Sequence, residues 1–154
     1  MSTVPITLDS LTVNNLGVFN KITSPTEYPS SYLDKCRESG ELCQYAYFSE
    51  VPVGVIVLDT IINKTPIALE ISLIKVLKSY KLEFNVEKKL IQYALDLAPK
   101  RHLSSCIVQI NSKDTQLINI FREMGFADDD IKKDIYCNVS SKGEDTILMT
   151  KSLT

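Results

Sequence analysis

Residues 67–110 read IALEISLIKV (67–76), LKSYKLEFN (77–85), VEKKLIQYALDLA (86–98), PKRH (99–102) and LSSCIVQI (103–110). The first and last of these segments are short and rich in aliphatic and β-branched residues, which is typical of buried strands. Within the third, apolar residues recur at the spacing of one helix face: Val86, Leu90, Ala94 and Leu97. The stretch therefore predicts a strand at 67–76, a helix at 86–98 and a strand at 103–110. If the two strands are parallel neighbours, their connection is a right-handed crossover.

The chain upstream of this stretch predicts three further strands and two helices. Pro25, Pro29 and Gly40 interrupt the pattern and separate the elements. The predicted elements are a strand at 6–8, a helix at 13–22 capped by Thr12 or Asn14, a helix at 32–38, and strands at 42–49 and 53–58 around a turn at 50–52.

The downstream chain predicts one more helix and two closing strands. The helix spans 115–124, with Ser112 or Asp114 as its N-cap and Gly125 as its end. Its apolar face comprises Leu117, Ile118, Phe121 and Met124. Strands follow at 135–139 and 146–149 around a turn at 141–143. The whole order predicts a mixed α/β fold, and with no repeats or linkers we expect a single domain over residues 1–154.

Composition excludes several classes of function. The formal net charge of -2 gives no broad basic surface for nucleic acid. His102 is the only histidine, and none of the four cysteines forms a Cys-x-x-Cys pair, so we expect no metal site. His102 follows a probable helix end, where a surface role is the simplest interpretation. No signal peptide or membrane span is visible, so we expect a cytoplasmic chain with reduced thiols.

Five segments carry a resemblance to a known family. FREMGF at 121–126 resembles the signature that closes the last helix of the GNAT acetyltransferases. SPTEYPSSY at 24–32 resembles the aromatic-Pro-x-x-Tyr loop of the NatE-type N-terminal acetyltransferases within that superfamily. GELCQYAYF at 40–48, followed by VPVG at 51–54, resembles two successive strands of the same group, and IKKDIY at 131–136 a later strand and loop. The resemblance implies the GNAT acyl-CoA N-acyltransferase fold over nearly the whole chain.

The resemblance also implies a pocket for the first residue of a peptide substrate. By matching position, Tyr28, Pro29, Tyr32 and Tyr136 would line it. Aromatic rings suit this task because they bury a large apolar side chain while a hydroxyl holds peptide polar groups. The alternative is that these tyrosines are half-buried anchors of the loop.

The acetyl-CoA site that the family implies is degraded in this sequence. The family binds the pyrophosphate with Arg/Gln-x-x-Gly-x-Gly/Ala at the start of the central helix, where glycines let phosphates approach bare N–H groups. Here Lys81 keeps the first charge, but Phe84 and Val86 replace the glycines around Asn85. The remaining implied cofactor contacts are Val76 and Leu77, through their main chains, and Asp114, for which helix capping is the alternative. Acetyl-CoA binding is therefore expected to be weak or absent.

The positions that match the family's catalytic tyrosine and histidine also differ. They hold Glu70 and Gln109. An amide cannot accept a proton at neutral pH. Glu70 could act as a base if desolvated, but a surface carboxylate at a strand edge is the alternative.

Three functions remain open. The first is a NatE-type subunit with little or no activity, associated with the scaffold and catalytic subunits of the NatA complex and, through them, with the ribosome. The second is an active N-terminal acetyltransferase that uses acetyl-CoA on nascent peptides beginning with Met and an apolar residue. The third is a GNAT enzyme that acts on small amines.

Overall fold

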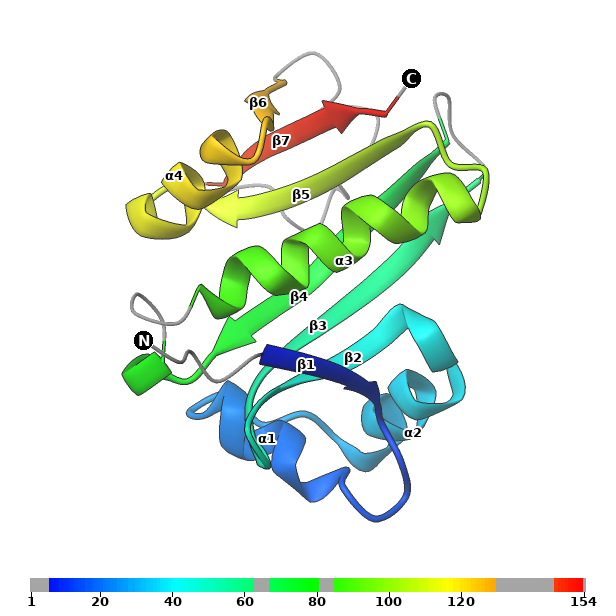
Figure 1. The fold of residues 1–154 in the computed structure, drawn as a ribbon, viewed down its shortest axis with the longest axis vertical. Helices are drawn as coiled ribbons and strands as arrows, with labels where there is room; N and C mark the ends of the chain where they lie inside the picture. The colour runs from blue at the N-terminus through cyan, green and yellow to red at the C-terminus, as the bar shows by residue number, and fades with distance from the viewer. Residues whose placement is uncertain (1–5, 63–66, 81–84, 130–145, 154) are drawn as a thin grey trace. The chain divides into compact units, whose positions relative to one another are not determined.

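The computed structural model describes residues 6–62, 67–80, 85–129 and 146–153 (Figure 1). The strands form one mixed sheet in the order β1-β2-β3-β4-β5-β7-β6. The chain divides into two compact units, Met1–Leu58 with Leu73–Leu90, and Asp59–Ser72 with Ile91–Thr154. Three elements contribute residues to both units: β3 (Val51–Ile61), β4 (Ala68–Val76) and α3 (Val86–Lys100).

The first unit contains an antiparallel meander of β1 (Ile6–Ser10), β2 (Cys43–Phe48) and β3. The predicted turn at 50–52 is wrong, because Val51 and Pro52 already belong to β3 and pair with Phe48 and Tyr47. The register shifts between Ala46 and Tyr47, next to Pro52. A bulge is one of the few places in a sheet that tolerates a residue without an N–H, which explains how this proline enters a strand.

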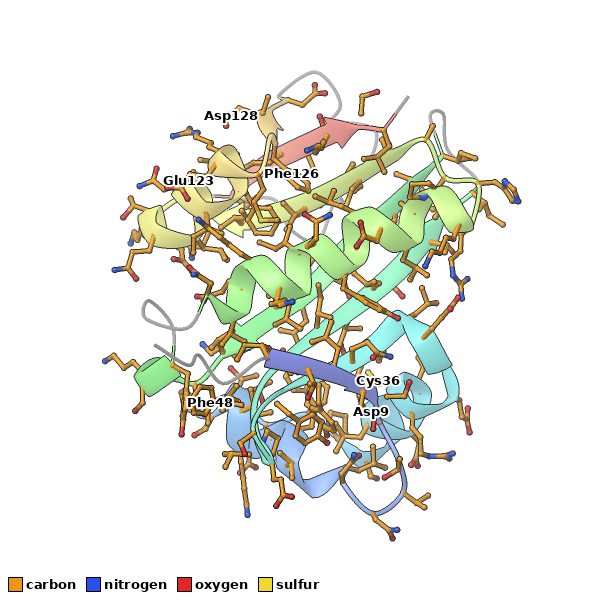
Figure 2. All side chains as sticks on the ribbon, in the orientation of Figure 1. Asp9, Cys36, Phe48, Glu123, Phe126 and Asp128 are labelled. Atoms are coloured by element: carbon orange, nitrogen blue, oxygen red, sulfur yellow. The ribbon has the colours of Figure 1, made fainter. Side chains whose placement is uncertain are left out.

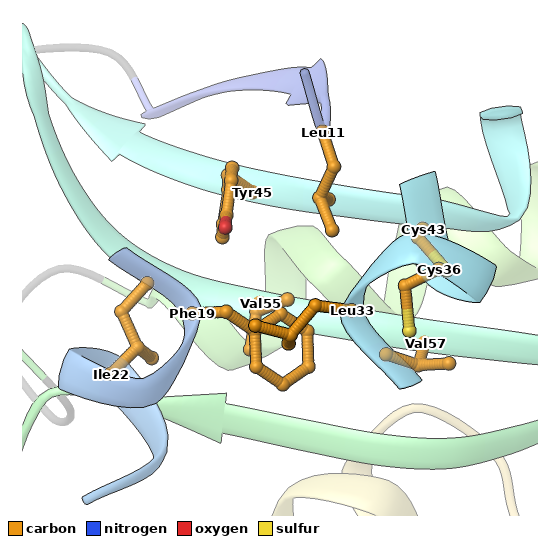
Figure 3. Close-up of a cluster of buried hydrophobic side chains, with 9 residues drawn as sticks. All are labelled: Leu11, Phe19, Ile22, Leu33, Cys36, Cys43, Tyr45, Val55 and Val57. Atoms are coloured by element: carbon orange, nitrogen blue, oxygen red, sulfur yellow. The ribbon is translucent and has the colours of Figure 1, made fainter. Parts of the chain in front are cut away.

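Two helices of the first unit, α1 (Gly17–Thr23) and α2 (Ser30–Glu38), cover a buried cluster of apolar side chains. Figure 3 shows this core cluster: Leu11, Phe19, Ile22, Leu33, Cys36, Cys43, Tyr45, Val55 and Val57. The predicted start of α1 at Val13 is wrong, and neither Thr12 nor Asn14 caps it. The side chain of Asn15 instead accepts a hydrogen bond from the Thr12 N–H at 2.7 Å, and this local turn holds residues 12–15 outside the helix.

The second unit is built on β5 (Ser105–Asn111), which pairs in parallel with β4 and antiparallel with β7 (Thr146–Ser152). A short strand, β6 (Ala127–Asp128), pairs with β7 after α4 (Thr115–Glu123). The strands on either side of α3 are thus parallel neighbours, the condition under which the sequence predicts a right-handed crossover. Ala68, Ile107 and Leu148 form a buried cluster on one face of these strands. The strand expected at 135–139 lies outside the described residues.

Helices α3 and α4 end in the same way. His102 has φ 62° and Gly125 has φ 96°, and in each case the next N–H bonds to a carbonyl five residues back: Leu103 to Ala98 at 2.9 Å and Phe126 to Phe121 at 3.0 Å. This is the left-handed closure that glycine favours. The rings of Phe121 and Phe126 meet edge to face at 4.9 Å, and Figure 2 shows Phe126 beside α4. The FREMGF segment therefore forms the C-terminal cap of α4, and Gly125 ends the helix as predicted.

The predicted apolar face of α3 is confirmed, since Val86, Leu90, Ala94 and Leu97 are all buried. On α4, Ile118 and Phe121 are buried, while Leu117 and Met124 are half-buried. None of the helices in the described part of the chain combines the length and apolar character that a membrane crossing requires. Nor do the described residues include a group of three or more His, Cys, Asp or Glu placed to hold a metal ion.

Candidate functional site

Three aromatic rings meet in the first unit, one from α1, one from the loop after it and one from α2. Tyr28 and Tyr32 lie face to face with their centroids 4.7 Å apart and their planes 23° apart. Phe19, fully buried on α1, meets both rings edge-on, at 5.5 Å for Tyr28 and 6.0 Å for Tyr32. Offset-stacked and edge-to-face pairs are the favoured aromatic geometries, so the three rings form a defined platform. The structure thus brings together two of the residues that the sequence predicted for peptide binding.

Both tyrosines of the platform are half-buried and pack against the core cluster, as the anchor interpretation expects. Pro29 is exposed, directly before the first residue of α2. Burial raises the pKa of the Tyr32 hydroxyl well above its ordinary value, and the neighbouring Cys36 adds to the rise. At neutral pH this hydroxyl is therefore a neutral hydrogen-bonding group. Tyr136 lies outside the described residues.

Two side chains of α1 hold the loop that leads to this platform. Asn20 makes hydrogen bonds with both main-chain groups of Tyr28: its Oδ1 accepts from the Tyr28 N–H at 2.8 Å, and its Nδ2 donates to the Tyr28 carbonyl at 3.2 Å. Thr23 Oγ1 lies 2.9 Å from the Thr26 carbonyl. The sequence reasoning missed both residues, because a contact across eight positions leaves no periodic signal. A sequence signal for these contacts would be an Asn and a Thr three positions apart on a helix that precedes an irregular loop.

The first residue of α3, Val86, follows the segment where the family's phosphate loop would lie and packs inside the first unit. Val86 is fully buried. Its Cγ1 lies 3.2 Å from where a Cβ on Gly54 would stand, and the Lys75 carbonyl and Val76 Cγ2 lie at the same distance. The Leu77 N–H donates to the Val53 carbonyl at 2.8 Å. Val76 and Leu77, two of the expected cofactor contacts, therefore belong to the packing between β3, β4 and α3.

The first turn of α3 also carries a buried acid. Glu87, which is not part of the predicted apolar face, is only 7% exposed. An anionic side chain in the first turn of a helix is favoured by the helix dipole and by the free N–H groups there. Asn85, just before the helix, is exposed and has φ 53°, a conformation that Asn tolerates better than most residues. Lys81 and Phe84 lie outside the described residues.

The two expected chemistry positions share one face of the sheet in the second unit. Glu70 on β4 is the register partner of Ile107 on β5, and Gln109 is two residues further along β5. Side chains two apart on a strand point to the same face, and so do register partners. Both are half-buried beside the apolar cluster that contains Ile107. Because β4 is an interior strand, the alternative of Glu70 as a strand-edge carboxylate is wrong.

Two further titratable residues of the second unit have structural roles. Asp114 is exposed and caps α4, where its Oδ1 accepts from the Leu117 N–H at 3.3 Å. This arrangement matches the capping alternative, and Asp114 rather than Ser112 is the cap. Burial raises the pKa of the Cys106 thiol from 9.0 to about 12, which Lys151 opposes. A neutral, buried thiol is a poor nucleophile, so this geometry gives Cys106 no catalytic part.

The whole chain was compared with known protein families, proteins and solved structures. No family model matches the chain. A fission yeast (Schizosaccharomyces pombe) protein described as an uncharacterized N-acetyltransferase is 27% identical over 154 residues, covering 96% of this chain and 99% of its own. Arabidopsis thaliana Naa50, solved with the bisubstrate analogue CoA-Ac-MVNAL, superimposes with a TM-score of 0.73 at 22% identity, over 96% of this chain and 98% of its own.

A GNAT-family acetyltransferase from Bacillus cereus superimposes with a TM-score of 0.75 at 16% identity, over 97% of this chain and 99% of its own. These likenesses extend over almost all of each chain, whereas the identities are low. They show that the chain has the mixed α/β fold of the GNAT acetyltransferases, as the sequence predicted.

Proposed function

We propose that this chain is a NatE-type N-terminal acetyltransferase subunit with little or no catalytic activity of its own. The observation that carries the proposal is the closed first turn of α3, where Val86 is fully buried and Glu87 is 7% exposed. In a GNAT fold this turn is where the glycine-rich loop would receive the pyrophosphate of acetyl-CoA. Here the first residue of the helix is a valine with a buried side chain, where the family has glycine or alanine.

Two physical effects oppose a pyrophosphate at this turn. A phosphate reaches helix N–H groups only where side chains leave the backbone open, which is why glycine is used. Val86 puts a β-branched side chain where the family has glycine or alanine, and its packing against Gly54 leaves that side chain little freedom to move aside. Glu87 places an acidic side chain in the same turn, and its charged form would repel an incoming polyanion. Acetyl-CoA is therefore expected to bind weakly or not at all.

The chemistry positions support the same proposal. Gln109 has an amide where the family's histidine would relay a proton, and an amide has no pKa near neutrality. Glu70 is the one titratable group of the pair, on the same face of the sheet. A single half-buried carboxylate without the family's histidine leaves the peptide amine with no complete proton path.

The retained features lie on the peptide side. Tyr28 and Tyr32 keep a defined geometry, and Pro29 stands between them in the chain. Together with Tyr136 they are the residues through which this subunit would contact a nascent peptide N-terminus. The proposed partners are the scaffold and catalytic subunits of the NatA complex in the cytoplasm, near the ribosome. This part of the proposal comes from the family resemblance carried by the segments at 24–32 and 40–54.

The retained peptide loop favours one alternative, an active N-terminal acetyltransferase for chains that begin with Met and an apolar residue. Such an enzyme would need a phosphate site other than the α3 turn and a proton path based on Glu70. It is the second candidate because only the peptide side supports it.

A paired measurement on the full chain separates the two functions. Acetyl-CoA is titrated calorimetrically, and acetyl transfer to a peptide beginning Met-Leu is assayed at the same protein concentration. The proposal expects no heat of binding at micromolar concentrations, no transfer above the rate without protein, and co-purification with the NatA scaffold subunit. Micromolar binding with turnover would establish the active enzyme instead.

A further inference from the structure

The aromatic platform depends on a loop that has little burial of its own. Residues 24–27 between α1 and Tyr28 are all exposed. An exposed segment of this kind gains little from apolar packing, so its conformation depends on specific hydrogen bonds. Within the described residues, side chains of α1 bond this loop at two points: Thr23 bonds to Thr26, and Asn20 bonds to Tyr28 at the end of the loop. Asn20 and Thr23 are three positions apart and therefore lie on one face of the helix.

Asn20 constrains Tyr28 more than an ordinary hydrogen bond does. A carboxamide has both a donor and an acceptor, and here the acceptor takes the N–H of Tyr28 while the donor serves the carbonyl of the same residue. Fixing both peptide groups on either side of one Cα fixes the direction of its Cα–Cβ bond. The ring of Tyr28 is then directed onto Phe19, the neighbour of Asn20 on α1, and onto Tyr32.

The effect extends to the residues that follow. The Pro29 carbonyl accepts from the N–H groups of Tyr32 at 3.0 Å and Leu33 at 3.2 Å, which begins α2. An error in the orientation of Tyr28 would therefore shift Pro29 and the start of α2 as well. The orientation of all the described residues assigned to peptide binding, Tyr28, Pro29 and Tyr32, therefore depends on Asn20.

We propose that Asn20 is a positioning residue for peptide binding: its paired hydrogen bonds to the Tyr28 main chain hold the Tyr28–Pro29–Tyr32 surface in the orientation that receives the first residue of a peptide. The inference rests on the proposed peptide-binding role of this loop. Asn20 itself is not proposed to touch the peptide. It acts through Tyr28, so its loss should affect peptide affinity more than its effect on stability would explain.

The test measures binding of a fluorescent Met-Leu peptide with a free N-terminus to the full chain, with the N-acetylated peptide as a specificity control. Asn20→Ala removes both hydrogen bonds and should weaken binding about tenfold. Asn20→Asp keeps an acceptor for the Tyr28 N–H but turns a second acceptor oxygen toward the Tyr28 carbonyl, so it should weaken binding at least as much as Asn20→Ala. Ile22→Val is the matched control, because Ile22 belongs to the core cluster and lies between Asn20 and Thr23 in the chain. It should lower stability without changing these hydrogen bonds, and so leave peptide affinity unchanged.

The outcomes separate this inference from the function on which it rests. If the wild-type chain does not bind the free peptide more tightly than the acetylated one, the peptide-binding role fails, and the inference fails with it. If the wild type binds but Asn20→Ala binds equally well, only the inference is overturned. If Asn20→Ala and Ile22→Val weaken binding in proportion to their thermal destabilisation, Asn20 has a merely structural role. A loss confined to the two Asn20 variants, beyond what their thermal destabilisation explains, supports the proposal.

Discussion

The loop at Tyr28–Tyr32 and the first turn of α3 belong to the same unit, yet they are built in opposite ways. The loop is held by polar side chains from α1, which leave its rings half-buried and its proline exposed. The first turn of α3 is held by Val86, fully buried against β3 and β4, and carries the buried acid Glu87. The Tyr28–Tyr32 segment leaves a surface that a ligand could contact. The first residue of α3, by contrast, packs inside the unit.

The contrast shows how a binding turn can become part of a core. Burying a valine contributes roughly 1.5–3 kcal/mol, and replacing a helix glycine by a residue with a side chain adds up to about 1 kcal/mol. Neither gain is available to a turn that must leave its backbone open to a phosphate. If the turn binds no phosphate, as proposed, side chains that pack there stabilise the fold. The comparison therefore predicts that reopening the α3 turn costs stability, while changes in the loop act mainly on binding.

The largest expected effect comes from Val86→Gly. Losing a fully buried side chain and placing glycine in the first turn of α3 should lower the free energy of unfolding by about 3 kcal/mol, measured by urea denaturation. Val86→Ala should cost about 2 kcal/mol, because it keeps the helix propensity. A cost below about 1 kcal/mol for the glycine variant would mean that Val86 is not a packing residue.

The double variant Phe84→Gly/Val86→Gly restores glycine at both glycine positions of the family's pyrophosphate motif. If the alignment of this turn is right, the double variant should bind acetyl-CoA more tightly than the wild type in the calorimetric titration. An affinity that does not move would contradict the assignment of residues 81–86 to the cofactor loop.

The next effect tests the same contact from β3. Gly54→Ala would place a methyl group 3.2 Å from the Lys75 carbonyl, Val76 Cγ2 and Val86 Cγ1. Overpacking of this kind costs about 1–2 kcal/mol in the free energy of unfolding. In a double-mutant cycle with Val86→Ala, the combined cost should be smaller than the sum by about 0.5 kcal/mol or more, because removing Cγ1 relieves one contact. Strict additivity would show that the two residues do not share the space.

The fold was accessible from the sequence wherever its signals were local and periodic. The apolar face of α3, the strands on either side of it and the end of α4 at Gly125 all follow from spacing or from glycine, and the structure confirms them. Boundaries set by single side chains were missed. The turn of Asn15 delays α1, and a bulge lets Pro52 enter β3. Neither interaction has a period, so pattern reasoning assigns the wrong limits.

The candidate site was accessible only in part. The resemblance picked out Tyr28 and Tyr32, and the structure stacks them. It gave no sign of Asn20, whose partner is eight residues away, or of the burial of Glu87. A charged residue next to a helix start is assigned to the solvated side by hydrophobic periodicity. Its burial depends on neighbouring elements that one helix pattern does not contain.

Glu87→Gln examines the charge at the α3 turn with little change of shape. Removing an anion from the first turn of a helix should lower the free energy of unfolding by about 0.5–1 kcal/mol through the helix dipole, and burial should keep the effect from vanishing in salt. Glu123→Gln is the matched control, since it makes the same substitution at the exposed last residue of α4, where an anion is disfavoured. Equal destabilisation by both variants in urea titrations at low and high salt would contradict a role for the helix end.

The smallest expected effect lies on the loop side and appears only at high pH. Burial raises the pKa of Tyr32 above its unfolded value of about 10, so the folded chain holds this proton more tightly than the unfolded chain does. The stability that this proton contributes is fully present below that unfolded value and is lost as pH rises above it. Tyr32→Phe should therefore flatten the fall in unfolding free energy between about pH 9.5 and 11 by a few tenths of a kcal/mol per pH unit. The effect stays below the limit of about 1.4 kcal/mol per pH unit for one proton, because the half-buried ring is partly screened by water. Below about pH 8 the wild type and the variant should respond to pH in parallel. Thermal melts across this range measure the difference, and curves that stay parallel up to pH 11 would show that the Tyr32 hydroxyl is as accessible as that of a surface tyrosine.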